Sequence, residues 1–161
     1  MSSALTNVNV NAQKGLADFL KIKCGDTEKI TELEELDLLN IASEMIQFNL
    51  SNNLLTTFIP KVKLIVLQKL DLSRNHIKYL SKDQFYELPN LRRLDISQNL
   101  ISQIDVLTFN NLKKLERLKL NQNQISFILE GTFDSLTDLK KLEISNNPLI
   151  CDRRSHLSIS R

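Results

Sequence analysis

The stretch Leu67–Asn90, LQKLDLSRNHIKYLSKDQFYELPN, decides the fold because the chain then repeats its pattern. The next 24 residues read LRRLDISQNLISQIDVLTFNNLKK, and the following 24 read LERLKLNQNQISFILEGTFDSLTD. Leucine, asparagine and phenylalanine recur at the same places in all three copies. A shorter unit of 22 residues precedes them with the same order of residue types. A fixed period of this kind predicts a stack of similar coils.

Apolar columns run through the repeats and define a core. In each LxL segment the apolar residues alternate with polar ones, which is typical of a short strand with one buried face. Strands of successive coils would stack about 4.8 Å apart as a parallel sheet. The columns are Leu67, Leu91, Leu115 and Leu139; Leu70, Leu94, Leu118 and Leu142; Leu72, Ile96, Leu120 and Ile144; and Phe85, Phe109 and Phe133, with Met45, Phe48, Leu50, Leu55 and Phe58 in the shorter unit.

An asparagine follows each strand, where the chain must bend. A carboxamide both donates and accepts, so it can satisfy backbone groups that the bend leaves unpaired. We therefore predict a structural ladder rather than a ligand site. Its members are Asn53, Asn75, Asn99, Asn123 and Asn147.

The spacing LxxLxLxxNxIxxLxxxxFxxLxx resembles the leucine-rich repeat, and within that family the 24-residue extracellular class of Slit-, Toll- and chaoptin-like repeats. The resemblance covers about residues 45–149. It implies an α/β solenoid: a right-handed curved solenoid with a parallel β-sheet on the concave face and mostly irregular or 3-10 convex segments. It also implies that capping segments cover the two ends of the core.

The expected organisation has four parts. Residues 1–17 form a poorly ordered N-terminal tail, and residues 18–44 form a cap-like segment. About five repeats occupy residues 45–150. Residues 151–161 form a tail or the remnant of a C-terminal cap.

The two cysteines, Cys24 and Cys151, stand at opposite ends of the repeats. Five or six strand spacings separate them by roughly 25 Å, too far for a disulfide, which needs Cα atoms within about 7 Å. Caps of extracellular relatives contain more cysteines, and Arg153 stands where the C-terminal cap pattern has one. These departures favour a truncated or diverged member of the family. Free thiols and an intermolecular bridge both remain open.

The residues between the strand leucines are expected to face the concave side. One column reads Gln47, Lys69, Arg93, Arg117 and Lys141, and the next reads Asn49, Asp71, Asp95, Lys119 and Glu143. These columns either form a recognition surface or only screen one another in water, since exposed pairs contribute little. If the face binds a partner, the candidate residues are Lys69, Arg92, Arg93, Arg117, Lys119 and Lys141.

Asn49, Leu50 and Ser51 form the one N-glycosylation sequon of the chain. A glycan on Asn49 would stand on the first strand, at the edge of the concave face. The tripeptide is either a used acceptor or a chance occurrence.

Other function classes have little support. The net charge of +2 does not suggest a nucleic-acid partner, and no stretch is apolar enough to be a membrane segment. His76 and His156 are scattered, and we expect no metal, no cofactor and no enzymatic activity. Gly131, before the Phe133 column, is expected to relieve a bend rather than to bind phosphate.

The resemblance therefore implies a non-enzymatic protein-recognition module of a secreted or cell-surface protein, used in adhesion or signalling, with a protein or glycan-bearing partner. A basic N-terminus followed by an apolar core, the mark of a signal peptide, is absent. This leaves open an intracellular, cytoplasmic leucine-rich repeat adaptor or scaffold. A protein without stable function, because its caps are incomplete, is the remaining alternative.

Overall fold

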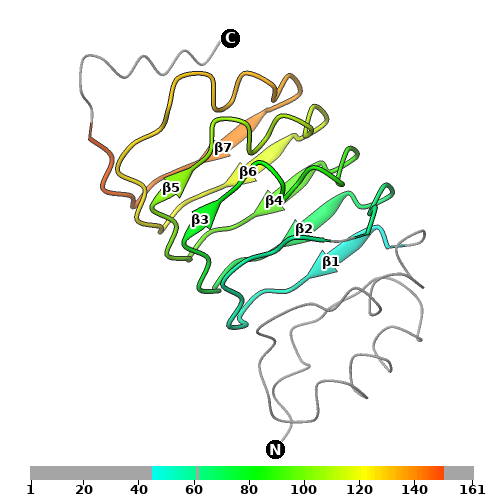
Figure 1. Cartoon of the computed structure of the whole chain (residues 1–161), viewed down its shortest axis with the longest axis horizontal. Coiled ribbons are helices and arrows are strands. Elements are labelled where there is room, and N and C mark those ends of the chain that lie inside the picture. The colour runs from blue at the N-terminus through cyan, green and yellow to red at the C-terminus, as the bar shows by residue number, and fades with distance from the viewer. Residues whose placement is uncertain (1–44, 61, 151–161) are drawn as a thin grey trace, which may run out of the picture.

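The computed structural model describes residues 45–60 and 62–150, which form a stack of coils (Figure 1). Each coil adds one strand to a parallel sheet, so the expected solenoid is confirmed. The predicted tail and cap-like segment (1–44) and the C-terminal remnant (151–161), with both cysteines and His156, lie outside the described residues.

The main sheet has five strands in the order β1-β2-β4-β6-β7, all parallel. The middle residue of each strand points into the core, and its two neighbours point outward. This is the alternation that the LxL pattern predicts. The strands are β1 (Gln47–Asn49), β2 (Lys69–Asp71), β4 (Arg93–Asp95), β6 (Arg117–Lys119) and β7 (Lys141–Glu143).

A second, two-stranded parallel sheet lies on the returning side of the coils (Figure 1). It pairs β3 (Tyr79–Leu80) with β5 (Gln103–Ile104). The sequence pattern did not predict this sheet, and the described residues contain irregular returns and turns but no 3-10 helix. Two residues per strand are too few for a periodic signal to emerge.

Phenylalanine rings form a continuous stack behind the main sheet. The rings of Phe85 and Phe109 lie 6.1 Å apart and within 6° of parallel. Those of Phe109 and Phe133 lie 5.8 Å apart at 22°. Just before the last ring, Gly131 adopts a φ of 82°, which explains why the bend uses glycine there.

Polar side chains directly before these rings are also buried, which the sequence reading missed. Gln84, Thr108 and Thr132 are each 2% exposed. Thr108 Oγ1 donates to the carbonyl of Leu80 at 2.9 Å, in the preceding coil. The hydroxyls thus satisfy backbone acceptors on the returning side, as buried polar groups must be satisfied.

The asparagine ladder links each coil to its predecessor. Asn99 Nδ2 donates to the carbonyl of Leu72 in the preceding coil at 2.9 Å and to that of Ile96 in its own coil at 3.2 Å. Its Oδ1 accepts from the backbone N–H of Ile77 at 3.0 Å. Asn75, Asn123 and Asn147 repeat the same three-way arrangement.

The residue before each ladder asparagine adopts a left-handed conformation. The φ angles lie between 55° and 59° at Asn52, Arg74, Gln98, Gln122 and Asn146. None of these residues is β-branched, which fits the steric cost of this region. Three of the side chains also form an exposed row, because Arg74 Nε donates to Gln98 Oε1 at 2.8 Å and Gln98 Nε2 donates to Gln122 Oε1 at 2.9 Å.

Replacing a ladder amide by a carboxylate should strongly destabilise the solenoid. In Asn99→Asp the new oxygen would face the carbonyls of Leu72 and Ile96, where Nδ2 now donates. We expect a loss of about 3 kcal/mol in the free energy of unfolding, measured by denaturant titration. The exposed Asn110, whose side chain makes no hydrogen bond to the described residues, gives the matched control Asn110→Asp. That change should alter stability by less than about 0.5 kcal/mol, and equal losses from the two variants would contradict the ladder's role.

Candidate functional site

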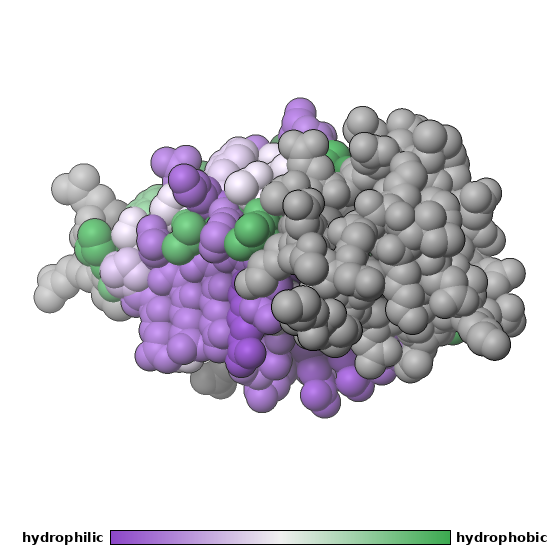
Figure 2. Space-filling view, turned by 90° about the horizontal axis from the view of Figure 1, so that it is seen from below, coloured by the Kyte–Doolittle hydropathy of each residue, from purple (hydrophilic) through white to green (hydrophobic). Residues whose placement is uncertain are grey.

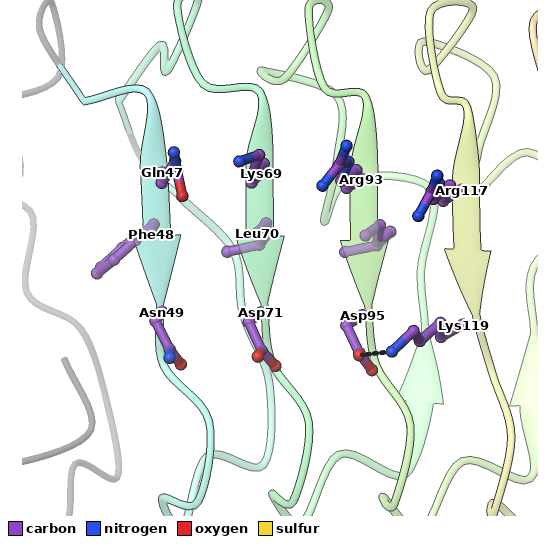
Figure 3. Close-up of a pocket in the computed structure, with 11 residues that line it drawn as sticks. Gln47, Phe48, Asn49, Lys69, Leu70, Asp71, Arg93, Asp95, Arg117 and Lys119 are labelled. Carbon is purple, nitrogen blue, oxygen red and sulfur yellow. Dashed lines mark ion pairs between the residues drawn. The ribbon is translucent and has the colours of Figure 1, made fainter. Parts of the chain in front are cut away.

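The outer face of the main sheet carries two polar rows that the strand register sets in line. Lys69 pairs with Arg93 and Arg93 with Arg117, while Asp71 pairs with Asp95. The face is hollowed over four strands, with a volume of about 340 Å³. Figure 3 shows its lining, which comprises Gln47, Phe48, Asn49, Lys69, Leu70, Asp71, Arg93, Leu94, Asp95, Arg117 and Lys119. We call this the sheet-face hollow.

The acidic row takes part in the fold itself. Asp71 Oδ1 accepts from the backbone N–H of Ser73 at 2.9 Å. Asp95 Oδ1 accepts from the N–H of Ser97 at 3.1 Å and from its hydroxyl at 2.6 Å. In β1, Asn49 Oδ1 takes the same position and accepts from Ser51 N–H at 2.8 Å. These side chains close the bend after each strand, so the candidate glycosylation residue Asn49 also has a structural contact.

Lys119 interrupts this row. Its ammonium lies 3.0 Å from Asp95 Oδ2, and this hydrogen bond raises the pKa of Lys119. An ammonium cannot accept from the following N–H as the acids do. Two residues later, Asn121 Oδ1 is buried and lacks a hydrogen-bond partner within residues 45–60 and 62–150. The fourth coil therefore exchanges a local turn contact for an ion pair across the strands.

Acidic neighbours also hold Arg92 and Lys141, two further candidate binding residues. Arg92 Nη1 lies 2.7 Å from Glu116 Oε1, and Lys140 Nζ lies 3.2 Å from the other oxygen of the same carboxylate. Lys141 Nζ lies 2.8 Å from Glu143 Oε1. Hydrogen bonds from Lys140 and then Arg92 lower the pKa of Glu116, and Lys141 lowers the pKa of Glu143.

Three of the six candidate cations have no partner of opposite charge within residues 45–60 and 62–150. Lys69, Arg93 and Arg117 form no ion pair with any described residue. They stand on adjacent strands, and their side chains project over the hollow (Figure 3). We call these three residues the cationic row, and Asp71 with Asp95 the acidic pair. The uncompensated positive charge of the face is therefore concentrated in one line.

Sequence reasoning missed the role of Glu116. Its place directly before a strand, 24 residues from both Arg92 and Lys140, was a usable signal. The period puts these three side chains in neighbouring coils, so a single acid between two bases predicts a triad. Glu116 thus engages Arg92, one of the six candidate cations, although it does not line the hollow.

A larger hollow, of about 630 Å³, lies on the returning flank beside β5. Its rim holds the half-exposed side chains of Tyr79, Phe127 and Leu129. Asp105 is the one carboxylate among its lining residues. Among the residues that are coloured in Figure 2, most are hydrophilic, and the hydrophobic ones form small separate groups.

Three further observations on the described residues concern the histidine, metal sites and membrane-spanning helices. His76 is exposed in the bend after Asn75. No group of three or more His, Cys, Asp or Glu side chains within the described coils has an arrangement that could hold a metal ion. The described segments also contain no helix with the length and hydrophobicity required to cross a membrane.

Comparison with known proteins agrees with this architecture. Residues 62–101 and 89–149 match the family model described as leucine rich repeat. No curated protein matches the chain. Among solved structures, a crystal structure of a TLR13–ssRNA13 complex is similar, with 28% sequence identity and a TM-score of 0.72. The similarity covers 75% of this chain and 17% of that one.

The triad around Glu116 should make stability depend on pH in the acidic range. Because the folded-state pKa of Glu116 is lowered, its contribution is present above the unfolded-state pKa and is lost as pH falls through the folded-state value. Between about pH 6 and pH 3, Glu116→Gln should therefore lose less stability than the wild type. Denaturant titrations at the two pH values measure the difference. Glu130→Gln, at an exposed position without an ion pair to described residues, is the control and should behave like the wild type.

Proposed function

The chain belongs to the leucine-rich repeat family, and on that premise we propose that it is a non-enzymatic recognition module whose partner is a protein. The sheet-face hollow is the proposed binding surface. The observation that carries the proposal is the cationic row, Lys69, Arg93 and Arg117, which forms no ion pair with the described residues, whereas Lys119 on the same face is paired with Asp95.

Preorganisation gives this surface its mechanism. The strands that hold the row are fixed by the main sheet, the ladder and the turn contacts of Asp71 and Asp95. Only side chains lose freedom when a partner binds, so little of the interaction energy is spent on ordering the backbone. A standard interface needs about 800 Å² on each partner, which requires most of the face.

Two classes of partner compete in this proposal: a protein and a nucleic acid. The TLR13 structure contains ssRNA, so the similarity does not support the expectation that nucleic acid is excluded. A cationic row also suits phosphates. Against RNA, the acidic pair stands beside the row within the same hollow. We therefore propose a protein partner and keep nucleic acid as the second candidate.

The proposed setting is extracellular or at the cell surface, with signalling or adhesion as the use. The phenylalanine-containing repeat of 24 residues supports this setting, and the Asn49 sequon is consistent with it. The competing proposal is an intracellular adaptor built on the same sheet face. Neither proposal involves catalysis, because each rests on binding through the sheet face.

Charge reversal on the row should separate face-specific binding from general electrostatics. Arg93→Glu with Arg117→Glu should weaken binding to a captured partner by at least about tenfold. Lys78→Glu with Lys82→Glu changes the net charge equally but lies off the main sheet and should change affinity by less than about twofold. Binding is measured by interferometry of the full chain against a panel of purified ectodomains. Equal losses from the two variants would exclude the sheet face as the site.

The mass of the endogenous protein tests the proposed setting. We expect recovery from the culture medium with a mass that falls after glycan removal, and the Asn49→Gln variant should lack this difference. Because the longer glutamine side chain also alters the turn contact of Asn49 Oδ1 with the Ser51 N–H, Ser51→Ala is the matched second variant: it removes the sequon and keeps Asn49 and that N–H. An unmodified protein found only inside cells would instead support the intracellular adaptor.

A further inference from the structure

The sheet-face hollow presents two parallel lines of charged side chains, one positive and one negative. The cationic row and the acidic pair are separated by two residues along each strand, or roughly 7 Å. Within each line, neighbouring side chains start about 4.8 Å apart. Both lines run across the strands, along the axis of the coil stack.

The two lines differ in how much of their charge is already engaged. Asp95 is held by Lys119 at 3.0 Å and by Ser97, and Asp71 accepts from Ser73. The cationic row has no such contacts among the described residues. A ligand would therefore gain more from meeting the cationic row than from meeting the acidic pair.

The row also has defined ends. Beyond Lys69, the next position is the neutral Gln47. Beyond Arg117, Lys141 is bound to Glu143 at 2.8 Å. Three adjacent positions therefore accept negative charge, and their two guanidinium groups are suited to bidentate contacts with carboxylates.

We propose that the sheet-face hollow binds an extended acidic segment of a protein partner, whose carboxylates meet Lys69, Arg93 and Arg117. This inference rests on the proposed function and names the ligand chemistry of the same site. In an extended segment, residues i and i+2 lie on one face about 6.6–7 Å apart. Two or three acidic side chains on that face match the length of the row, because the long cationic side chains adjust to the difference in spacing.

The acidic pair favours such a segment over a uniform polyanion. Asp71 and Asp95 lie well within the screening length of about 8–10 Å from the cationic row. A chain with one negative charge on every unit would be repelled by them. A protein segment can place acids over the row and neutral or basic residues over the acidic pair, so its charge pattern can fit both lines.

The test uses the full chain and fluorescence anisotropy. The main probe is a labelled peptide of alternating glutamate and serine, about six residues long, which spans roughly 20 Å when extended. A peptide with glutamine in place of glutamate is the control for charge. A single-stranded RNA of matched charge represents the polyanion. The variants are Arg93→Gln with Arg117→Gln and, as the matched control, Lys78→Gln with Lys82→Gln.

We expect the glutamate peptide to bind at least about tenfold more tightly than the glutamine peptide and the RNA. The double change at Arg93 and Arg117 should reduce its affinity about tenfold, and the control pair should leave it within about twofold. RNA that binds as tightly as the glutamate peptide, or equal losses from both variants, would overturn the proposal.

These measurements separate a failure of the acidic-segment proposal from a failure of the proposed function. If the glutamate peptide does not bind but the capture of a protein partner still depends on Arg93 and Arg117, the acidic-segment proposal fails and the recognition face stands. If neither the peptide nor a captured partner depends on these residues, both proposals fail.

Discussion

The hydrogen bonds of the ladder asparagines are the contacts on which the rest of the structure depends. Directly after a main-sheet strand the backbone still pairs with the next coil, as Leu72 N–H does with the carbonyl of Asp95, but the N–H groups that follow the bend are satisfied by a side chain. Asn75 Oδ1 accepts from the N–H of Leu55, and Asn99 Oδ1 accepts from that of Ile77. Each coil therefore completes the hydrogen bonding of its predecessor. The bend can then be buried without unsatisfied groups, and the apolar columns can stack without interruption.

This constraint extends to the surface. The second outward position of each strand is largely committed to the bend, where Asn49, Asp71 and Asp95 accept from the N–H two residues later. The side chain at the first outward position makes no such hydrogen bond to the bend. That position is therefore the column in which side chains vary at little cost to the fold, and it is the column that holds the cationic row.

Much of this architecture could be predicted from the sequence because it repeats. The apolar columns, the buried phenylalanine stack and the parallel pairing all follow from a period of 24 residues. What escaped prediction depends on single side chains and short segments. Each strand of the β3–β5 sheet is only two residues long. The contacts of Glu116 depend on how three long side chains meet across coils. The expectations for the caps, Cys24 and Cys151 concern residues outside those described.

The ladder has one more consequence, which concerns how a chain of this kind changes length during evolution. The ladder bonds of Asn99 reach no farther than the adjacent coil, and Asn123 offers the same contacts one coil later. The ladder contacts are therefore of the same kind at successive boundaries, so duplication or loss of one unit leaves the ladder with a junction of the same type. The first unit, whose register to β2 spans 22 residues rather than 24, shows that the returning segment also tolerates small deletions. The number of coils, and with it the length of the recognition face, can thus change by genetic events that leave the packing rules unaltered.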